Sequence, residues 1–231
     1  MISLLAVSLV FTASGQKKVN PVFAPIEDNP DLPRVLLIGD SISIAYTLPV
    51  REKLDGIANL HRVPTNAGHT GMGLEGLSKW LEDRGGKWDV IHFNWGLHDL
   101  CYRHPDSKVQ GNRDKVNGTI AVPLDQYEKN LEALVLQLKA TGAKLIWAST
   151  TVVPEGEAGR FVGDDVKYNS VAAKVMRKHG IVINDLHALS KSFGGKYSQP
   201  GNVHFDKDGS AKLAAQVSQA IIAQLAEQTC G

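Results

Sequence analysis

Cysteine is scarce in this sequence and the charges nearly cancel, and each of these features excludes a class of protein. Only Cys101 and Cys230 are present, too few for a disulfide-stapled scaffold or a four-cysteine zinc site. The 25 Lys and Arg residues against 24 Asp and Glu residues leave a formal net charge of +1, which argues against a protein held to nucleic acid by its net charge. The 231 residues, 43% of them hydrophobic, are enough for one α/β domain with its own core.

Hydrophobic runs long enough to cross a bilayer are also missing. The apolar run over residues 2–13 is shorter than the roughly 20 residues that a membrane span needs. Small residues up to Gly15 and then polar residues follow it, so we predict a secretory signal peptide over 1–15 and export to a periplasm or out of the cell. The alternative is an apolar N-terminal helix or strand of the fold. Residues 16–33 then form an extended lead, and 34–231 form one domain with no membrane span in the mature protein.

Export bears on the two cysteines. In an oxidising compartment Cys101 and Cys230 could form a disulfide that ties the C-terminal tail to the loop after Asp99. The alternative is two unrelated thiols, because sequence does not give the distance between the two Cα atoms.

Short apolar runs alternate with helical patterns along the chain. Such alternation predicts crossover units and a parallel sheet with helices on both faces. We therefore predict a three-layer α/β/α sandwich with a five-stranded parallel sheet, of the flavodoxin-like kind. The expected strands are 34–38, 59–65, 88–94, 143–149 and 181–184, and the expected helices are 48–57, 74–82, 123–141, 164–179 and 207–228.

Four loops hold the unusual residues, and each follows an expected strand or precedes the last helix. In this architecture ligands bind at the carboxyl ends of the strands, near the point where the strand order reverses. We expect the four loops, distant in sequence, to meet at that edge of the sheet. They are 39–43, 66–68, 95–99 and 201–205.

The residue types in these loops suit acyl transfer. A serine hydroxyl such as that of Ser41 is a poor nucleophile until a base takes its proton, and His204 is the candidate base. The reaction also creates an oxyanion that needs preorganised donors. The candidate donors are the backbone N–H groups of Ser41 and Gly68 and the side chain of His98. The alternative is a plain strand-to-helix turn in which Ser41 or Ser43 caps a helix.

In order and spacing these blocks resemble the SGNH (GDSL-like) hydrolase superfamily. Gly39-Asp40-Ser41 resembles its first block, Gly68 its second, Gly96-Leu97-His98-Asp99 its third, and His204 its last. The resemblance runs from about residue 34 to the C terminus. It implies a serine esterase with Ser41 as nucleophile, His204 as base, and no metal or organic cofactor. The α/β-hydrolase alternative is disfavoured, because Ser41 lacks the second glycine of Gly-x-Ser-x-Gly.

Two positions depart from the family pattern. His98 stands where the family usually has asparagine, and Gly201 stands where it has the aspartate that orients the histidine. Asn202, a backbone carbonyl or a carboxylate from elsewhere, such as Asp206 or Asp208, could orient His204 instead.

Three further residues of the family blocks, Asp40, Gly96 and Asp99, are expected to support the site. The two aspartates would do so by accepting hydrogen bonds from loop amides, and not by carrying protons.

Other polar residues give weaker signals. His92, His98, Asp99 and His104 fit no standard metal-ligand spacing, so no metal is expected. The segment 100–122 is rich in turn-forming residues and is predicted to be a long loop. Its Arg103, His104 and Arg113 could bind an acidic substrate or simply be solvated.

The resemblance and the expected export together predict an exported serine esterase that removes small acyl groups, acetyl above all, from a carbohydrate or a small ester. A lipase, thioesterase or acyltransferase of the same family would use the same serine and histidine. A different class also stays open, a glycan-binding protein whose catalytic site has degenerated, and Gly201 is the residue that favours it.

Overall fold

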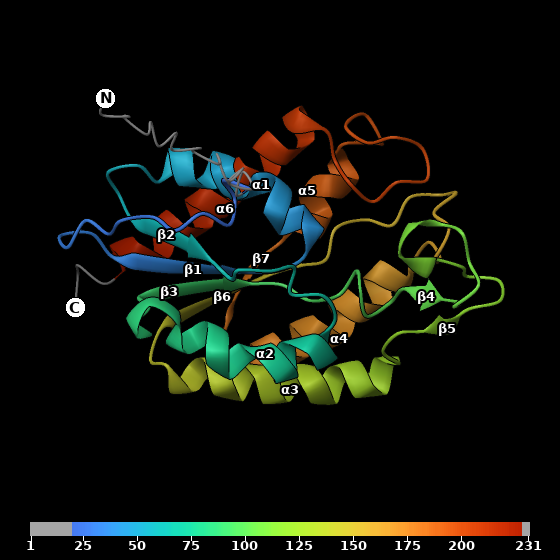
Figure 1. The fold of residues 1–231 in the computed structure, drawn as a ribbon, viewed down its shortest axis with the longest axis horizontal. Coiled ribbons are helices and arrows are strands. Elements are labelled where there is room, and N and C mark those ends of the chain that lie inside the picture. Colours follow the sequence, from blue (N-terminus) through green and yellow to red (C-terminus); the bar gives the residue numbers. More distant parts are fainter. Residues whose placement is uncertain (1–19, 228–231) are drawn as a thin grey trace, which may run out of the picture.

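The computed structural model describes residues 20–227, so the predicted signal peptide and Cys230 lie outside the described residues. A five-stranded parallel sheet forms the centre of the fold, in the order β2-β1-β3-β6-β7 (Figure 1). Helices cover both of its faces, which confirms the predicted three-layer α/β/α fold. The strands are β1 (Arg34–Ile38), β2 (Asn59–Arg62), β3 (Val90–Phe93), β6 (Lys144–Ala148) and β7 (Val182–Asn184).

The helices form two layers, one on each side of the sheet. Helices α1, α5 and α6 pack on one face and α2, α3 and α4 on the other (Figure 1). Each layer buries the apolar side of its helices against strands that are mostly apolar on both faces, as expected of parallel strands between two helical layers. The edge strand β2 is the exception, with the buried polar residues Asn59, His61 and Arg62. The helices are α1 (Ser41–Lys53), α2 (Thr70–Glu82), α3 (Leu124–Ala140), α4 (Asp164–His179), α5 (Leu186–Ser192) and α6 (Lys207–Ala226).

Strand β1 decides where the site lies. It pairs with β2 on one side and β3 on the other, with Leu37 opposite both Arg62 and His92. The order of strands along the chain therefore reverses at β1, which makes its carboxyl end the topological switch point. Four residues of β1, Val35 to Ile38, are at most 2% exposed, so the core holds this end of the sheet firmly.

The structure corrects several details of the expected elements. Helix α1 ends at Lys53, β2 ends at Arg62, α2 begins at Thr70, and α5 was not expected. Helix α1 begins at Ser41 and not near residue 48, because the Asp40 side chain caps it. The segment 100–122 is not an open loop: β4 (Tyr102–Arg103) and β5 (Thr119–Ile120) pair as a short antiparallel sheet beside the main one. Within residues 20–227, no helix is both long enough and apolar enough to cross a lipid bilayer.

Candidate active site

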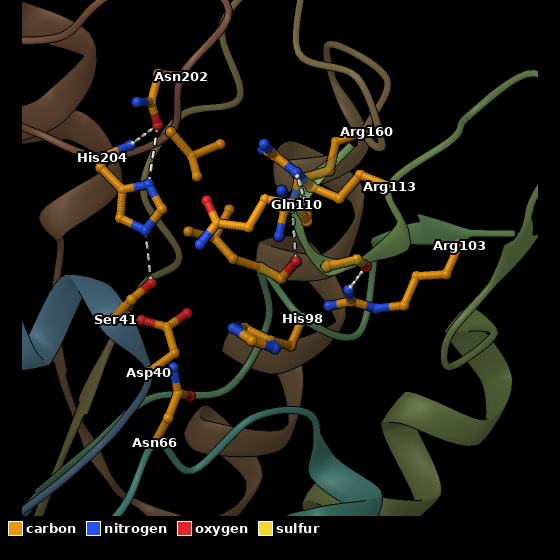
Figure 2. A pocket seen from close by; sticks show the side chains of 13 residues that line it. Asp40, Ser41, Asn66, His98, Arg103, Gln110, Arg113, Arg160, Asn202 and His204 are labelled. Carbon is orange, nitrogen blue, oxygen red and sulfur yellow. Dashed lines mark hydrogen bonds between the residues drawn. The ribbon is translucent and has the colours of Figure 1, made fainter. Parts of the chain in front are cut away.

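A pocket of about 270 Å³ opens at the carboxyl ends of β1 and β3. Residues from all the loops singled out in the sequence reach it or lie beside it. Its lining is mainly polar and charged, with Leu97 and Val203 as the hydrophobic side chains (Figure 2).

Ser41 is placed in this pocket by the cap of α1. Oδ1 of Asp40 accepts a hydrogen bond from the Ile42 backbone N–H at 2.9 Å, and the Ser43 hydroxyl donates to the Asp40 carbonyl at 2.8 Å. Asp40, and neither serine, is therefore the N-cap, and the alternative in which Ser41 or Ser43 plays that part is wrong. The Ser41 hydroxyl is left free to face the pocket.

The Ser41 hydroxyl meets His204, 163 positions further along the chain. Ser41 Oγ lies 2.8 Å from His204 Nε2 (Figure 2). This distance is within the range required of a nucleophile and its general base.

Asn202 fixes the protonation of the His204 ring. Its Oδ1 accepts from the backbone N–H of His204 at 3.0 Å and lies 2.9 Å from Nδ1 of the same ring. Because a carbonyl oxygen only accepts, Nδ1 carries the hydrogen, and Nε2 of the neutral ring is left to accept from the Ser41 hydroxyl. Of the groups left open by the sequence, Asn202 is the one that contacts the ring.

Gly201 explains why the usual aspartate is absent. Its φ is +69°, and a Cβ at this position would lie 2.8 Å from the carbonyl oxygen of Gly156. A side chain here would meet both a strained backbone and a backbone clash. The departure from the family pattern is thus part of how the loop before α6 packs against the loop around Gly156.

The charges around the pocket act on the His204 ring. Partial desolvation lowers the pKa of His204 below its ordinary value, the nearby guanidinium groups of Arg160 and Arg113 lower it further, and the Asp40 carboxylate acts in the opposite direction. The net effect keeps the ring neutral, and able to accept a proton, to lower pH than usual.

Among the residues that the structure describes, two of the expected oxyanion donors, the Ser41 backbone N–H and the His98 ring, are not engaged in other hydrogen bonds. As the first residue of α1, Ser41 has a backbone N–H with no carbonyl one turn earlier to bond. His98 lines the pocket, and within the described part of the chain neither of its ring nitrogens has a hydrogen-bond partner. Desolvation lowers the pKa of His98, so its ring is neutral at neutral pH and has one N–H to donate.

The third expected donor, Gly68, is placed differently. Its N–H donates to Oδ1 of Asn66 at 2.9 Å, and Gly68 does not line the pocket, whereas Asn66 does. The cause is an Asx turn: the Asn66 side chain bonds the backbone two residues on, and Gly68 takes a φ of +61° to follow it. The expectation that the Gly68 N–H faces the substrate is therefore corrected. At the pocket this loop instead offers Asn66: its side-chain oxygen is bonded to the Gly68 N–H, and its NH₂ is the group that can donate to a substrate.

Asp99 and Gly96 shape the loop behind the pocket. Oδ1 of Asp99 accepts from the Thr70 backbone N–H at 2.8 Å and from the Thr70 hydroxyl at 2.6 Å, which ties the start of α2 to this loop. Burial raises the pKa of Asp99 to about 7. Gly96 packs so closely on Thr150 that an added Cβ would lie 1.9 Å from the Thr150 hydroxyl.

Cys101, in the same region, is fully buried. Its suggested disulfide partner Cys230 lies outside the described residues, so their pairing stays a prediction.

Sequence reasoning missed three contributors to the pocket besides Asn66. Arg160, Gln110 and Gly111 line it. Gln110 lies in the segment taken for an open loop, and Arg160 lies in the stretch between β6 and α4, where neither periodicity nor a motif marks it. Proximity to the expected loops appears only once the chain is folded.

The sequence matches the model of the GDSL-like lipase/acylhydrolase family over residues 37–212. That span is well over half of the chain, and with the fold it defines a carboxylic ester hydrolase. The chain belongs to the GDSL-like lipase/acylhydrolase family, which confirms the resemblance noted in the sequence.

Solved structures of esterases resemble the fold at low identity. The lipase/acylhydrolase from Enterococcus faecalis has a TM-score of 0.66 at 18% identity, over 83% of this chain and 96% of that one. The acetylxylan esterase from Geobacillus stearothermophilus has a TM-score of 0.60 at 18% identity, over 82% and 94%. The acetyl xylan esterase AlAXEase has a TM-score of 0.63 at 17% identity, over 81% and 99%. At these identities the likeness is one of fold. No curated protein matches the sequence.

Proposed function

We propose that this protein is an exported serine esterase that removes small acyl groups, acetyl above all, from a carbohydrate. The observation that carries the proposal is the hydrogen-bonded series from Ser41 through His204 to Asn202, which has the order of nucleophile, base and orienting group. It also argues against the degenerate binding protein, because Asn202 contacts the ring in place of the missing aspartate.

The reaction follows from the atoms in contact. Ser41 Oγ attacks the ester carbonyl carbon while its proton passes to Nε2 of His204. The resulting imidazolium keeps its Nδ1–H on Asn202, and the tetrahedral intermediate places its oxygen near the donors described above. When the C–O bond to the alcohol breaks, His204 returns the proton to the leaving oxygen. Water, deprotonated by the same nitrogen, then attacks the acyl-enzyme and releases the carboxylic acid and free Ser41.

Three donors are assigned to the oxyanion. They are the Ser41 backbone N–H, the His98 ring N–H and the Asn66 side-chain NH₂. The Gly68 N–H would join them only by exchanging its bond with Asn66. Each donor of this kind lowers the barrier by about 3 kcal/mol when it meets the developing charge.

The character of the pocket supports a small acyl group and a polar alcohol. A volume of about 270 Å³ and a lining in which polar side chains outnumber hydrophobic ones suit a sugar hydroxyl better than a lipid. The acetylxylan esterases among the structures of like fold support the same substrate class by analogy.

One observation favours a second candidate, an esterase for longer acyl chains. A more apolar pocket of about 210 Å³ lies next to the first and shares Asn202 and Val203 with it. Phe193 and Phe205 contribute to its lining. A chain of several carbons could extend from the reacting carbonyl past Val203 into this pocket.

One experiment tests catalysis and chain length together. Hydrolysis of p-nitrophenyl acetate, butyrate and octanoate is compared for the wild type, Ser41→Ala and, as a matched control, Ser192→Ala on the exposed side of α5. The proposal expects acetate to be preferred, Ser192→Ala to equal the wild type, and Ser41→Ala to lose nearly all activity. Equal rates in wild type and Ser41→Ala would refute the serine mechanism, and a preference for octanoate would favour the second candidate.

Export has its own test. When the full chain is expressed in a bacterium with a periplasm, N-terminal sequencing of the protein released by osmotic shock should begin at Gln16. Protein that stays in the cytoplasm with Met1 or Ile2 at its N terminus would refute export. Activity on acetylated xylooligosaccharides, against an acetylated lipid of equal ester content, then tests the carbohydrate assignment.

A further inference from the structure

The pocket has two unlike walls. One carries the Ser41–His204 pair and Asn202, and the other carries three arginines, Arg103, Arg113 and Arg160 (Figure 2). The hydrolytic steps derived above do not use the second wall. A cluster of guanidinium groups beside a nucleophile therefore calls for another role.

Arg103 and Arg113 lie side by side, on the same face of the segment that contains the short β4–β5 sheet. Arg103 ends β4, and its backbone forms an isolated antiparallel bridge with Arg113. Side chains of directly bridged residues project to the same face, and like charges so placed destabilise each other. The fold keeps this unfavourable pairing at the mouth of the pocket, where an anion would relieve it.

Too few carboxylates lie nearby to neutralise the wall. Glu157 is fully buried and serves two arginines at once, with its Oε1 at 2.5 Å from Arg113 and 3.1 Å from Arg160. Arg103 has no ion-pair partner among residues 20–227. Asp40 is the carboxylate that lines the pocket itself, and it accepts from the Ile42 N–H beside Ser41. Arg103 thus keeps one positive charge without an ion-pair partner in the described part of the chain. Arg113 and Arg160 together keep one more, because they share the single negative charge of Glu157.

The arginines are also preorganised. Arg103 donates through Nη1 to the carbonyl of Gly111, Arg113 donates through Nε to the carbonyl of Gln110 at 3.0 Å, and Arg160 donates through Nε to the carbonyl of Leu97 at 2.7 Å. Each bond uses part of the guanidinium fork and fixes the rest. Fixed arginine forks are the side chains best suited to binding carboxylate, sulfate or phosphate groups.

We propose, resting on the esterase function proposed above, that the alcohol portion of the natural substrate carries an anionic oxyacid group bound by Arg103 and Arg113. An acylated acidic sugar has this chemistry, with the ester at Ser41 and the carboxylate or sulfate on the arginine wall. Arg160, bonded to both Glu157 and the Leu97 carbonyl, acts as a positioning residue that keeps Glu157 and the wall in place.

Three aryl acetates of the same size test the proposal: 3-acetoxybenzoate, 3-acetoxybenzenesulfonate and the neutral 3-acetoxybenzamide. The wild type should show a kcat/KM at least about tenfold higher for one or both anions than for the amide, as expected of a charge-assisted contact. That ratio should fall as NaCl rises, because salt screens the wall. Whichever anion gives the larger ratio identifies the source, a carboxylate-bearing or a sulfated alcohol.

Substitutions test whether Arg103 and Arg113 cause the preference for anionic acetates. Arg103→Gln and Arg113→Gln should each bring the anion-to-amide ratio close to one, and Arg103→Lys should keep part of it. Arg177→Gln is the matched control, since it removes the same charge from the last turn of α4, outside the pocket, and should leave both rates unchanged. A wild-type ratio near one, or a ratio that survives in both Gln variants, would overturn the proposal.

The amide separates this proposal from the one on which it rests. If the wild type cleaves the amide and the anions equally well, the esterase function stands and the anion preference is wrong. If no acetate is cleaved, calorimetric titration with the product 3-hydroxybenzoate against 3-hydroxybenzamide still decides the matter. Binding of the anion alone, lost in Arg103→Gln, supports the arginine wall as an anion site, and equal or absent binding overturns it.

Discussion

Oδ1 of Asn202 contacts both the backbone N–H and the ring Nδ1 of His204, at 3.0 and 2.9 Å. An uncharged amide thus stands where a carboxylate usually holds the histidine of such a site. It selects the same tautomer of the ring but offers less stabilisation to the imidazolium that forms when Ser41 is deprotonated. Because Asn202 is neutral where a carboxylate is usual, it adds no negative charge to its wall of the pocket, opposite the arginines of the other wall.

Two substitutions test whether Asn202 orients His204, one that removes the acceptor and one that replaces it with a carboxylate. Asn202→Ala removes the acceptor, frees the ring to rotate, and should lower kcat/KM for p-nitrophenyl acetate by at least about tenfold, part of the roughly 10²–10⁴-fold that a positioned base contributes. Asn202→Asp places a carboxylate on Nδ1–H and should raise the pKa of His204, moving the acid limb of the pH–rate profile upward. An unchanged rate in the first variant with an unmoved limb in the second would show that Asn202 does not orient the ring.

The pH dependence of the wild type has a defined direction. The base works only when neutral, and the pKa of His204 is lowered by desolvation and by Arg160 and Arg113. Activity should therefore persist below pH 6.5 and fall only as the pH drops through the lowered pKa. Arg113→Gln removes one of the causes and should shift the limb toward higher pH. A wild-type limb above pH 6.5 in a kcat/KM profile would contradict this account of the site.

His98 is expected to act on the transition state. His98→Ala removes its N–H and should reduce kcat roughly 10²–10³-fold with little change in KM, as the loss of one oxyanion donor does. His98→Asn keeps a donor on a shorter side chain and should recover part of the loss. His104→Ala, outside the pocket lining, serves as control. A rise in KM at constant kcat would instead assign His98 to ground-state binding.

Asp99 should make stability depend on pH. Its pKa is raised from 3.8 to about 7 by burial, so its contribution to stability is complete below about pH 3.8 and is lost as the pH rises to about 7. Asp99→Asn keeps an acceptor for Thr70 without the charge. Relative to the wild type it should gain free energy of unfolding over that range, by at most about 1.4 kcal/mol per pH unit. Urea unfolding at pH 4.5, 6 and 7.5 measures the difference, and parallel pH curves would contradict the assignment.

The sheet could be predicted from the sequence because most of its strands are short apolar runs that end at glycine or polar loops; β2, with Asn59, His61 and Arg62, is the exception. Strand β1 and helix α4 match their expected ranges, since each has clear signals at both ends, such as Gly180 after α4. The start of α1 was missed because its first four residues, Ser-Ile-Ser-Ile, alternate polar and apolar side chains instead of following a helical spacing, and because the start depends on the Asp40 cap. The pairing of β4 with β5 is two residues long and leaves no periodic pattern.

The part of the site that belongs to recognisable sequence motifs could be predicted. Ser41, His204 and His98 lie at the pocket as expected, because each belongs to a block that follows a strand or precedes a helix. The free donor at Asn66 in place of Gly68 depends on an Asx turn, and Arg160 depends on the packing of a distant loop. Neither has a signature in the linear sequence.

The central claim is that Ser41, activated by His204, attacks the ester carbonyl. Peptide mapping by mass spectrometry after treatment with the phosphotriester paraoxon tests it most directly. The account predicts one diethylphosphoryl group on Ser41 in the wild type, none in Ser41→Ala, and far slower labelling in His204→Ala. A label on another residue, or equal labelling rates with and without His204, would contradict it.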